Sequence, residues 1–204
     1  MDLFGGSAHF PAGLTPIPVV DGELAFMTQL PLPLANDLVL TRLIGETDWR
    51  SDTITLWGKQ FLQPRLTAWH GDAAYRYSGL TLAPQPFTEL QEIIRQAVQT
   101  ATGRTFNSVL LNYYRDGRDS MGMHSDDEAE LGVDPAIASV SFGAERVFIL
   151  RHKSSGERLR LKLSDGSLLL MAGSLQKYWS HGINKTTKVL GPRINLTFRT
   201  ILKV

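Results

Sequence analysis

Two histidines and one aspartate have the residue types and the spacing of a metal site. His124 and Asp126 flank Ser125 in the segment RDGRDSMGMHSDDEAELG, and His181 lies far along the chain in YWSHGIN. Residues two apart in a strand point to the same side, so the first two side chains can converge on one ion. Two imidazoles and one carboxylate are the ligand set of non-haem Fe(II) oxygenases, in which positions stay open for O2 and a cosubstrate. Zinc accepts the same set, and an H-x-D pair with a distant histidine is by itself a weak signal.

Other polar residues of these types are interpreted as structural. His9, His70 and His152 have no carboxylate partner at ligand spacing. Asp119 and Glu130, in the acidic stretch around His124, are expected to be solvated loop residues, since charged side chains are seldom buried without a partner.

The segment PRINLTFRT predicts a strand with one apolar and one polar face. Isoleucine, leucine and phenylalanine alternate there with Arg193, Asn195, Thr197 and Arg199. Burying two guanidinium groups costs free energy unless anions meet them, and guanidinium forks suit carboxylates. The two arginines are roughly 20 Å apart along a strand, so they hold opposite ends of a diacid if the strand curves, or one faces solvent.

A second strand offers matching polar groups. Asn112 and Tyr114, also two apart, supply an amide and a hydroxyl that would line the same pocket. The alternative for the arginines is a structural ion pair with the acidic residues near 126–130.

Two helical patterns come before these strands. Residues 32–48 (LPLANDLVLTRLIGETD) have apolar residues at helical spacing. A clearer pattern follows Pro86, where Thr88 and Gln91 form a capping box and Gly103 lies where the helix should end. We expect both helices to pack against a larger element.

From residue 106 onward the hydrophobic period changes to two, which predicts strands. Turn signals such as SSGE and SDG separate the runs, which lie at 106–114, 136–142, 146–152, 158–163, 167–172 and 192–201. No helical pattern lies between these runs, which argues against a parallel βαβ sheet. The pattern favours a sandwich or jelly roll with the preceding helices on its outer face.

The composition of the chain excludes few classes of protein. The chain has 204 residues, 43% of them hydrophobic, which is enough for the core of one globular domain. There is no cysteine, which excludes disulfides and thiolate zinc sites. The net charge of +1 does not exclude nucleic acid, because a local basic face can bind it. Without an apolar stretch long enough for a membrane span or the pattern of a signal peptide, we expect a cytoplasmic protein with no membrane partner.

Four segments together carry a resemblance to a known family. They are NSVLLNYYRDGRDSMGMHSDDEAEL, PAIASVSFGAERVFILRHK, GSLLLMAG and VLGPRINLTFRTIL. In order and spacing, from about residue 36 to the C-terminus, the chain resembles the AlkB family of Fe(II)/2-oxoglutarate dioxygenases. It is most similar to the animal DNA-repair branch and its bacterial relatives.

The resemblance implies a fold and a set of ligands. It implies an α+β fold with a mainly β core, a double-stranded β-helix or jelly roll, supported by N-terminal helices. Fe(II) would be held by the catalytic residues His124, Asp126 and His181. The cosubstrate 2-oxoglutarate would be bound by residues of the N-x-Y and R-x-N-x-T-x-R motifs, here Asn112, Tyr114, Arg193, Asn195, Thr197 and Arg199.

The resemblance also implies an activity and a substrate. Fe(II), 2-oxoglutarate and O2 would oxidise an N-methyl group of a base such as 1-methyladenine or 3-methylcytosine in alkylated DNA. The base would be restored with release of formaldehyde and succinate. We expect a monomer with an N-terminal extension at 1–30, a nucleotide-recognition lid with supporting helices at 31–105, and the catalytic core at 106–204.

A flipped base needs an apolar wedge and aromatic faces. TLWGK reads as a hairpin tip with Trp57 before Gly58, and Trp57 is interpreted as the wedge rather than as a lid on a local core. Tyr75 and Tyr77 lie in YRYSGLTLAP, which resembles the nucleotide-recognition lid of the family. Asp127 and Glu128, just after the aspartate ligand, would contact a cationic methylated base.

Basic residues are candidates for binding the phosphate backbone. Near the hairpin tip these are Lys59 and Arg65, and further along they are RHK at 151–153, Lys185 and Lys188. The loop after His181 has fewer basic residues than in the most similar relatives, which leaves single strands or RNA as alternatives to duplex DNA.

Three alternatives remain open at this point. A dioxygenase of the same fold acting on RNA or on a protein side chain would not need Trp57. A non-catalytic nucleic-acid-binding module with a structural metal would leave Arg199 unexplained. A zinc hydrolase would explain neither Arg193 nor Arg199.

Overall fold

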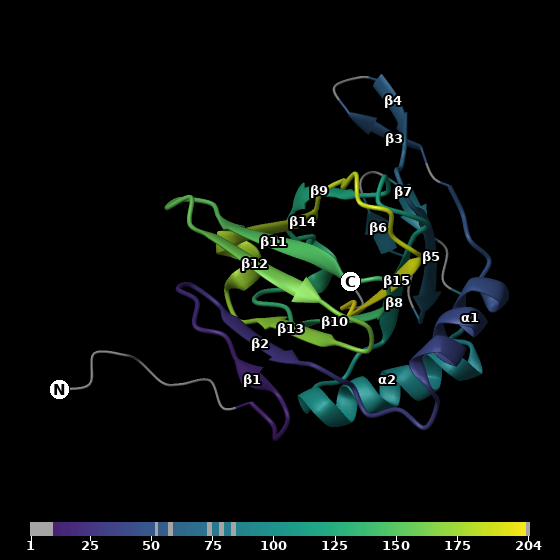
Figure 1. Cartoon of the computed structure of the whole chain (residues 1–204). Helices are drawn as coiled ribbons and strands as arrows, with labels where there is room; N and C mark the ends of the chain where they lie inside the picture. Colours follow the sequence, from purple (N-terminus) through teal and green to yellow (C-terminus); the bar gives the residue numbers. More distant parts are fainter. Residues whose placement is uncertain are drawn as a thin grey trace.

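The computed structural model describes residues 10–51, 53–56, 59–72, 75–77, 80–82 and 85–202. Within these ranges two antiparallel sheets and two longer helices form three layers (Figure 1). The mainly β architecture confirms the predicted fold class of an α+β jelly roll.

The larger sheet has seven strands in the spatial order β1-β2-β13-β10-β15-β8-β5. Their bounds are Thr15–Pro16 (β1), Glu23–Met27 (β2), Leu66–Gly71 (β5), Ser108–Tyr114 (β8), Ile137–Gly143 (β10), Leu168–Ala172 (β13) and Arg193–Arg199 (β15). All the pairings recorded between these strands are antiparallel. The sheet therefore has the alternating strand directions of a jelly roll.

The smaller sheet has four strands in the order β12-β11-β14-β9. Their bounds are Met121–His124 (β9), Arg146–His152 (β11), Arg158–Leu163 (β12) and Trp179–Ile183 (β14). Two further hairpins are formed by Thr53–Leu56 (β3) with Lys59–Leu62 (β4), and by Tyr75–Tyr77 (β6) with Leu80–Leu82 (β7). The β3–β4 hairpin projects from the rest of the molecule (Figure 1).

The two predicted helices are present, and both lie beside the larger sheet (Figure 1). The first, α1 (Asn36–Glu46), falls within the predicted residues 32–48. The second, α2 (Glu89–Thr102), begins at the predicted capping box of Thr88 with Gln91 and ends at Gly103, whose φ of 64° is the left-handed conformation. Two short helical turns, α3 (Leu175–Tyr178) and η1 (Ala129–Leu131), lie near the candidate metal ligands.

Two hydrophobic layers hold the elements together. One face of the larger sheet packs on the helices, where Val109, Val140 and Leu196 meet Ile94 and Val98 of α2 in one core cluster. The opposite face packs on the smaller sheet through a second cluster that joins residues of β8, β10 and β13 to residues of β11, β12 and β14. The polar pocket described below lies between the two sheets.

The segment predicted as an N-terminal extension contributes strands to the larger sheet. Within residues 1–30, β1 and β2 both join this sheet, β2 by pairing with β13. At the other edge β5 pairs with β8. The larger sheet thus extends beyond residues 106–204, and the predicted division at residues 30 and 105 stays a prediction.

No helix within the described ranges is long and apolar enough to span a membrane.

Candidate metal centre and cosubstrate pocket

His124 and His181 come from neighbouring strands of the smaller sheet. The pairing of β14 with β9 places His181 directly opposite His124, with an irregular register between His181 and Ile183. Their ring centroids are 4.4 Å apart. Gly182 permits this close pairing, because a Cβ there would lie 2.8 Å from the carbonyl oxygen of Met121.

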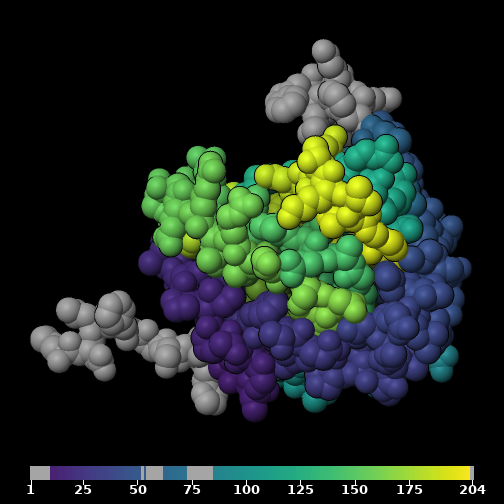
Figure 2. Space-filling model, in the orientation of Figure 1, coloured from purple at the N-terminus to yellow at the C-terminus, as the bar shows by residue number. Residues whose placement is uncertain are grey.

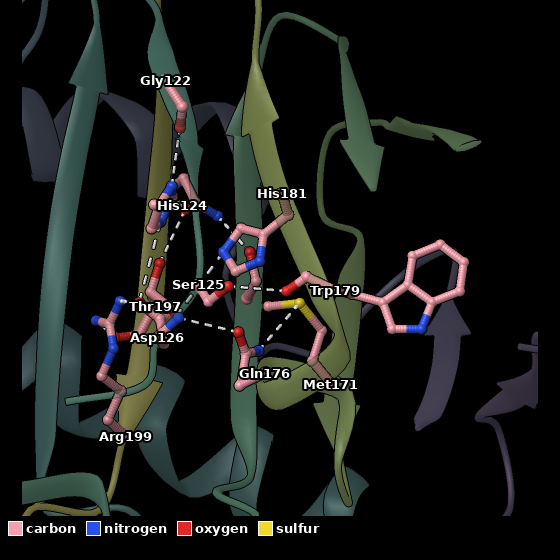
Figure 3. A network of polar contacts seen from close by, with 12 residues as sticks. Gly122, His124, Ser125, Asp126, Met171, Gln176, Trp179, His181, Thr197 and Arg199 are labelled. Atoms are coloured by element: carbon pink, nitrogen blue, oxygen red, sulfur yellow. Dashed lines mark hydrogen bonds and ion pairs between the residues drawn. The ribbon is translucent and has the colours of Figure 1, made fainter. Parts of the chain in front are cut away.

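Asp126 follows β9 and is held by contacts from the short helix α3 and from the larger sheet (Figure 3). Its backbone N–H donates to Oε1 of Gln176 at 3.0 Å, which fixes the chain just beyond the strand. Its side-chain Oδ1 accepts a 2.8 Å hydrogen bond from Nη2 of Arg199 on β15. The carboxylate is 1% exposed, so this charged contact compensates for its burial.

The three side chains form a ligand set. One ligand atom from each of His124, Asp126 and His181 lies within 4.8 Å of the others. Nε2 of His124 is 4.0 Å from Oδ1 of Asp126, and Nε2 of His181 is 4.0 Å from Oδ2. Nδ1 of His124 lies 2.9 Å from the carbonyl oxygen of Gly122, and donation of its proton there would leave Nε2 free for a metal.

Burial and charge keep these groups in the protonation states that a metal needs. Burial lowers the pKa of His181 to about 3, and it also lowers the pKa of His124. Burial by itself raises the pKa of Asp126, but the charges of Arg199 and the two histidines outweigh it, and that pKa falls to about 2. Both imidazoles are therefore neutral and the carboxylate is ionised near neutral pH, as metal ligation requires.

A polar pocket adjoins the ligands between the sheets. It is lined on one side by the three ligand residues and on the other by residues of β8, β10 and β15, namely Tyr114, Ser139, Arg193, Asn195, Thr197 and Arg199. Every residue of β15 is buried, so neither arginine of that strand faces solvent. The predicted alternation is confirmed, since Ile194, Leu196 and Phe198 belong to the core on the helix side.

Arg193 is buried with part of its guanidinium group aimed into this pocket. Its Nη2 donates to Oγ of Ser141 at 2.9 Å, and its guanidinium carbon lies 5.0 Å from the ring centroid of Tyr114. Within the described ranges its Nε and Nη1 have no hydrogen-bond partner. Burial lowers the pKa of Arg193 to about 10, so the group is still charged at neutral pH. A buried guanidinium of this kind is suited to an anionic ligand.

The other residues predicted to bind the cosubstrate also lie together, but the side chain of Asn195 bonds to protein groups. Asn112 and Tyr114 lie directly opposite Asn195 and Arg193 in the β15–β8 pairing. Nδ2 of Asn195 donates to Oγ of Ser139 at 2.7 Å and to the carbonyl oxygen of Val140 at 2.9 Å. Its Oδ1 accepts from Oγ1 of Thr197 at 3.0 Å. Asn195 therefore cross-links β15 to β10 through its own side chain.

Two interpretations of the sequence are wrong, and a third residue has a partner that the sequence did not suggest. Arg65 was expected to contact phosphate from the surface, but it is 4% exposed, and its Nε donates to Oδ1 of Asn112 at 2.7 Å. Asp119 was expected in a solvated loop but is 5% exposed and pairs with Arg115 at 2.8 Å. His152, which has no carboxylate at ligand spacing in the sequence, lies with its Nε2 3.1 Å from Oδ2 of the distant Asp21, a contact apart from the metal ligands. Asn112 and Asp21 come from segments far along the chain from Arg65 and His152, whereas Arg115 lies only four residues before Asp119.

The residues predicted to contact the base are only partly described. Trp57 and Gly58 lie outside the described residues, and so do the side chains of Lys59, Tyr75 and Tyr77. The β3–β4 hairpin predicted around Trp57 is present. Asp127 is exposed, Glu128 is half-buried, and Nζ of Lys153 lies 3.8 Å from Oδ2 of Asp127.

Several pocket residues were missed in the sequence. Ser139 lines the pocket and Ser141 accepts from Arg193; both alternate with Val140 in AIASVSF, so the alternation that identified the polar face of β15 would have identified them too. Gln176 gives no such signal, because it lies on the short helix α3 and reaches Asp126 only through the tertiary fold.

The residues present fit an iron ion and 2-oxoglutarate. Two neutral imidazoles and one carboxylate match the ligand set of non-haem Fe(II), and Oδ2 of Asp126 is buried with no hydrogen-bond partner within the described residues. The partner-free donors of Arg193 in the same pocket match a carboxylate of a diacid. Fold and site together are those of the Fe(II)- and 2-oxoglutarate-dependent oxygenases.

Comparison with known proteins agrees with this class. The family described as the 2OG-Fe(II) oxygenase superfamily matches residues 26–199. A solved structure of OsALKBH1 has the same fold, with a TM-score of 0.62 and 16% identity, over 87% of this chain and 97% of that one.

Similar proteins of known name show to which family within this superfamily the chain belongs. The DNA oxidative demethylase ALKBH2 of Homo sapiens is 47% identical over 73% of this chain and 61% of its own length. The ALKBH2 of Bos taurus is 46% identical over 73% of this chain and 57% of its own length. The alpha-ketoglutarate-dependent dioxygenase alkB homolog 3 of Homo sapiens is 40% identical over 81% of this chain and 61% of its own length. The chain belongs to the AlkB family of the 2OG-Fe(II) oxygenase superfamily, as the sequence resemblance implied, and spans about three fifths of the length of these relatives.

Proposed function

We propose that the protein removes methyl groups oxidatively from N-alkylated bases in DNA, such as 1-methyladenine and 3-methylcytosine, at the expense of 2-oxoglutarate and O2. The observation that carries the proposal is the placement of His124, Asp126 and His181 in one pocket with the partner-free donors of Arg193. The names of the ALKBH2 relatives, which are DNA oxidative demethylases, support the choice of DNA.

The ligand residues divide into two sets. His124, Asp126 and His181 would hold Fe(II). The cosubstrate would be bound by Arg193 and Arg199 at its charged groups, with Asn112, Tyr114, Asn195 and Thr197 shaping the pocket. When bound, iron and 2-oxoglutarate supply the oxidation by O2 that converts an N-methyl group to a hydroxymethyl group, which leaves as formaldehyde while CO2 and succinate are formed.

The chain itself supplies geometry and exclusion of water. Arg199 and Gln176 fix Asp126 from its side chain and its backbone, so the carboxylate enters the site in one orientation. Phe148 and Ile183 line the apolar part of the pocket and limit access of solvent to the ligands. Because both imidazoles are neutral, they need not lose a proton before they bind a metal.

The base would approach from the side of Asp127 and Glu128, which follow the aspartate ligand. A carboxylate there favours a base that carries positive charge, as 1-methyladenine and 3-methylcytosine do. A base in a duplex must be flipped out to reach a buried site, and we assign Trp57 and Gly58 at the tip of the β3–β4 hairpin to the wedge. Tyr75 and Tyr77 would stack on or hydrogen-bond to the flipped base, and Lys59 would contact the backbone.

Exposed cations near the site are candidates for phosphate binding. Arg151, Lys153, Lys185 and Lys188 are all exposed. Whether the strand is single or double, and whether RNA is also a substrate, depends on these contacts. A monomeric state and a cytoplasmic location stay predictions.

The experiment that tests the proposal supplies purified protein with Fe(II), 2-oxoglutarate, ascorbate and O2. Duplex and single-stranded oligonucleotides carrying 1-methyladenine or 3-methylcytosine, and the matching RNA, are weighed by mass spectrometry. We expect loss of one methyl group with formation of succinate, and neither with His124→Ala.

Three other outcomes would contradict the proposed function, and each would support a different one. Succinate without demethylated oligonucleotide would indicate a dioxygenase of another substrate, such as a protein side chain. Demethylation of RNA but not of DNA would show that the substrate is RNA. Absence of succinate would contradict catalysis and leave a non-catalytic binding module.

A further inference from the structure

The outer face of the smaller sheet carries a row of cations, and all of them except Arg151 lie outside the phosphate contacts proposed above. Arg158, Arg160 and Lys162 alternate along β12 with Leu159, Leu161 and Leu163. The leucines turn inward, where Leu163 belongs to the core cluster between the sheets. The three cationic residues are exposed. We call Arg151, Arg158, Arg160 and Lys162 the basic face.

Arg151 extends the row onto the neighbouring strand. It lies directly opposite Arg158 in the β11–β12 pairing, which puts the two side chains on the same face. Like charges directly opposite each other destabilise a pair of strands, so this arrangement is unfavourable in the protein alone. An anion bound across both strands would relieve the repulsion.

Few carboxylates neutralise the basic face. Lys162 lies 3.4 Å from Glu145, but within the described part of the chain no carboxylate lies within 4.0 Å of a nitrogen of Arg151, Arg158 or Arg160. The whole chain has a net charge of only +1, so this concentration of positive charge is local. A local field of one sign on a near-neutral protein is the electrostatic feature of a polyanion-binding surface.

The basic face continues from the rim of the candidate site. Nζ of Lys153, at the end of β11, lies 3.8 Å from Oδ2 of Asp127, which follows the ligand Asp126. From there the cations follow β12, where Arg160 lies opposite Ile149 of β11, which in turn lies opposite Gly182 of β14. The strands β11 and β12 lie at the front of the molecule in Figure 1, and their atoms form the surface there in Figure 2.

We propose that the basic face binds the sugar-phosphate backbone of the substrate strand outside the nucleotide that enters the site. This inference rests on the proposed function for the identity of the strand. Alternate residues on a strand are about 6.7 Å apart, so the three cations of β12 span about 13 Å. Measured along the axis of a duplex, where the phosphates of one strand recur about every 3.4 Å, that length corresponds to about four phosphates.

A lipid surface fits the same charges less well. Binding to a bilayer usually adds apolar side chains that enter the headgroup region. The large hydrophobic side chains that are exposed within the described ranges include none on β11 or β12. Val147 and Ile149, which share the face with the cations, are only half-exposed.

The test is the salt dependence of binding. The double variant Arg158→Gln/Arg160→Gln removes two charges and leaves the pair of Lys162 with Glu145 intact. The matched control Arg42→Gln/Arg104→Gln removes two charges on the helix side of the larger sheet. The affinity for a labelled oligonucleotide is measured by fluorescence anisotropy at several salt concentrations. The oligonucleotide has about 20 nucleotides, which is long enough to cover about four phosphates beyond the site.

We expect the double variant to bind about tenfold more weakly at low salt. The slope of log affinity against log salt should fall by about 1.4 for single strands and about 1.8 for duplex, since each phosphate contact contributes about 0.7 or 0.9. The control should keep the slope of the parent. Arg158→Lys/Arg160→Lys should also keep it, because a point charge suffices for phosphate.

Three results would overturn the proposal. The first is a slope that is the same in the double variant and the parent. The second is a slope that falls equally in the control, which would indicate net charge alone. The third is weaker binding to vesicles containing phosphatidylserine with oligonucleotide binding unchanged, which would assign the face to a membrane.

The result that would contradict the proposed function differs from the results that would contradict the role of the basic face. A parent protein that demethylates no oligonucleotide, yet loses salt-dependent binding when the basic face is neutralised, would contradict the proposed activity and retain the binding surface.

Discussion

Arg199 and Asp126 form a buried ion pair that joins the two sheets at the candidate metal centre. Nη2 of Arg199, on β15 of the larger sheet, donates to Oδ1 of Asp126, beyond β9 of the smaller sheet, at 2.8 Å. The sequence left open that the arginines of β15 form structural ion pairs with acidic residues near 126–130. Arg199 does form such a pair, and its partner is the candidate metal ligand Asp126. Arg199 can thus serve the metal centre by orienting a ligand while it lines the cosubstrate pocket.

Arg199→Lys should weaken metal binding. Lysine keeps the charge but lacks the planar fork that holds Oδ1, so Asp126 loses its fixed orientation. Loss of such an outer contact typically lowers metal affinity about 10- to 100-fold. Titration with Mn(II) or Co(II) by calorimetry measures this without turnover, and Arg42→Lys on α1 is the control. Equal affinities in the two variants would show that Arg199 does not position the ligand.

Arg193→Met should weaken binding of 2-oxoglutarate while metal binding is retained. The variant removes the buried donors that have no partner among the described residues. Truncating one member of a buried charged contact costs about 2–5 kcal/mol, which corresponds to a loss of affinity of about 30-fold or more. Calorimetric titration of the Mn(II)-loaded protein with 2-oxoglutarate measures the change. Unchanged affinity would place the carboxylate elsewhere in the pocket.

Arg146→Met should loosen the two loops beside the pocket. Arg146 is 4% exposed, and its guanidinium donates to the carbonyl oxygens of Asp116, Asp119 and Asn184 at 3.2, 2.9 and 2.7 Å. Removing it leaves buried carbonyl groups without donors, at a cost of about 2 kcal/mol in the free energy of unfolding. Hydrogen exchange should become faster at 115–120 and 184–190. Arg115→Met serves as the control, because Arg115 contacts only the first of the two loops through Asp119.

His70 should make the protein less stable as the pH falls. Burial lowers the pKa of His70 below its ordinary value of 6.5, while Nδ1 lies 2.8 Å from the carbonyl oxygen of Pro86. Below pH 6.5 the unfolded chain takes up a proton that the folded protein resists, so the free energy of unfolding decreases. The decrease cannot exceed about 1.4 kcal/mol per pH unit for one group. Urea denaturation from pH 8 to pH 5 should show a shallower decrease for His70→Gln, and parallel curves would contradict the assignment.

Local sequence patterns predicted the elements and much of the pocket. The alternation in PRINLTFRT predicted β15 with one apolar and one polar face, because side chains of a strand alternate between its two faces, and the structure places the apolar face toward the helices. The capping box at Thr88 predicted the start of α2, because its two hydrogen bonds form within four residues. Both signals are local, so neither depended on knowing the fold. Residue types and spacing grouped His124, Asp126 and His181, the resemblance strengthened that grouping, and in the structure one ligand atom of each lies within 4.8 Å of the others.

Only the tertiary structure decided how distant polar residues pair. The burial of Arg65 against Asn112 had no counterpart in the local pattern, and neither did the contact of His152 with Asp21. The contact of Arg199 with Asp126 depends on the packing of one sheet on the other. A sequence determines which face of a strand a side chain occupies, because that follows from the chain's own geometry. Which charge meets it there is decided by the folding of remote segments, since a buried charge is stable only where the fold brings its partner.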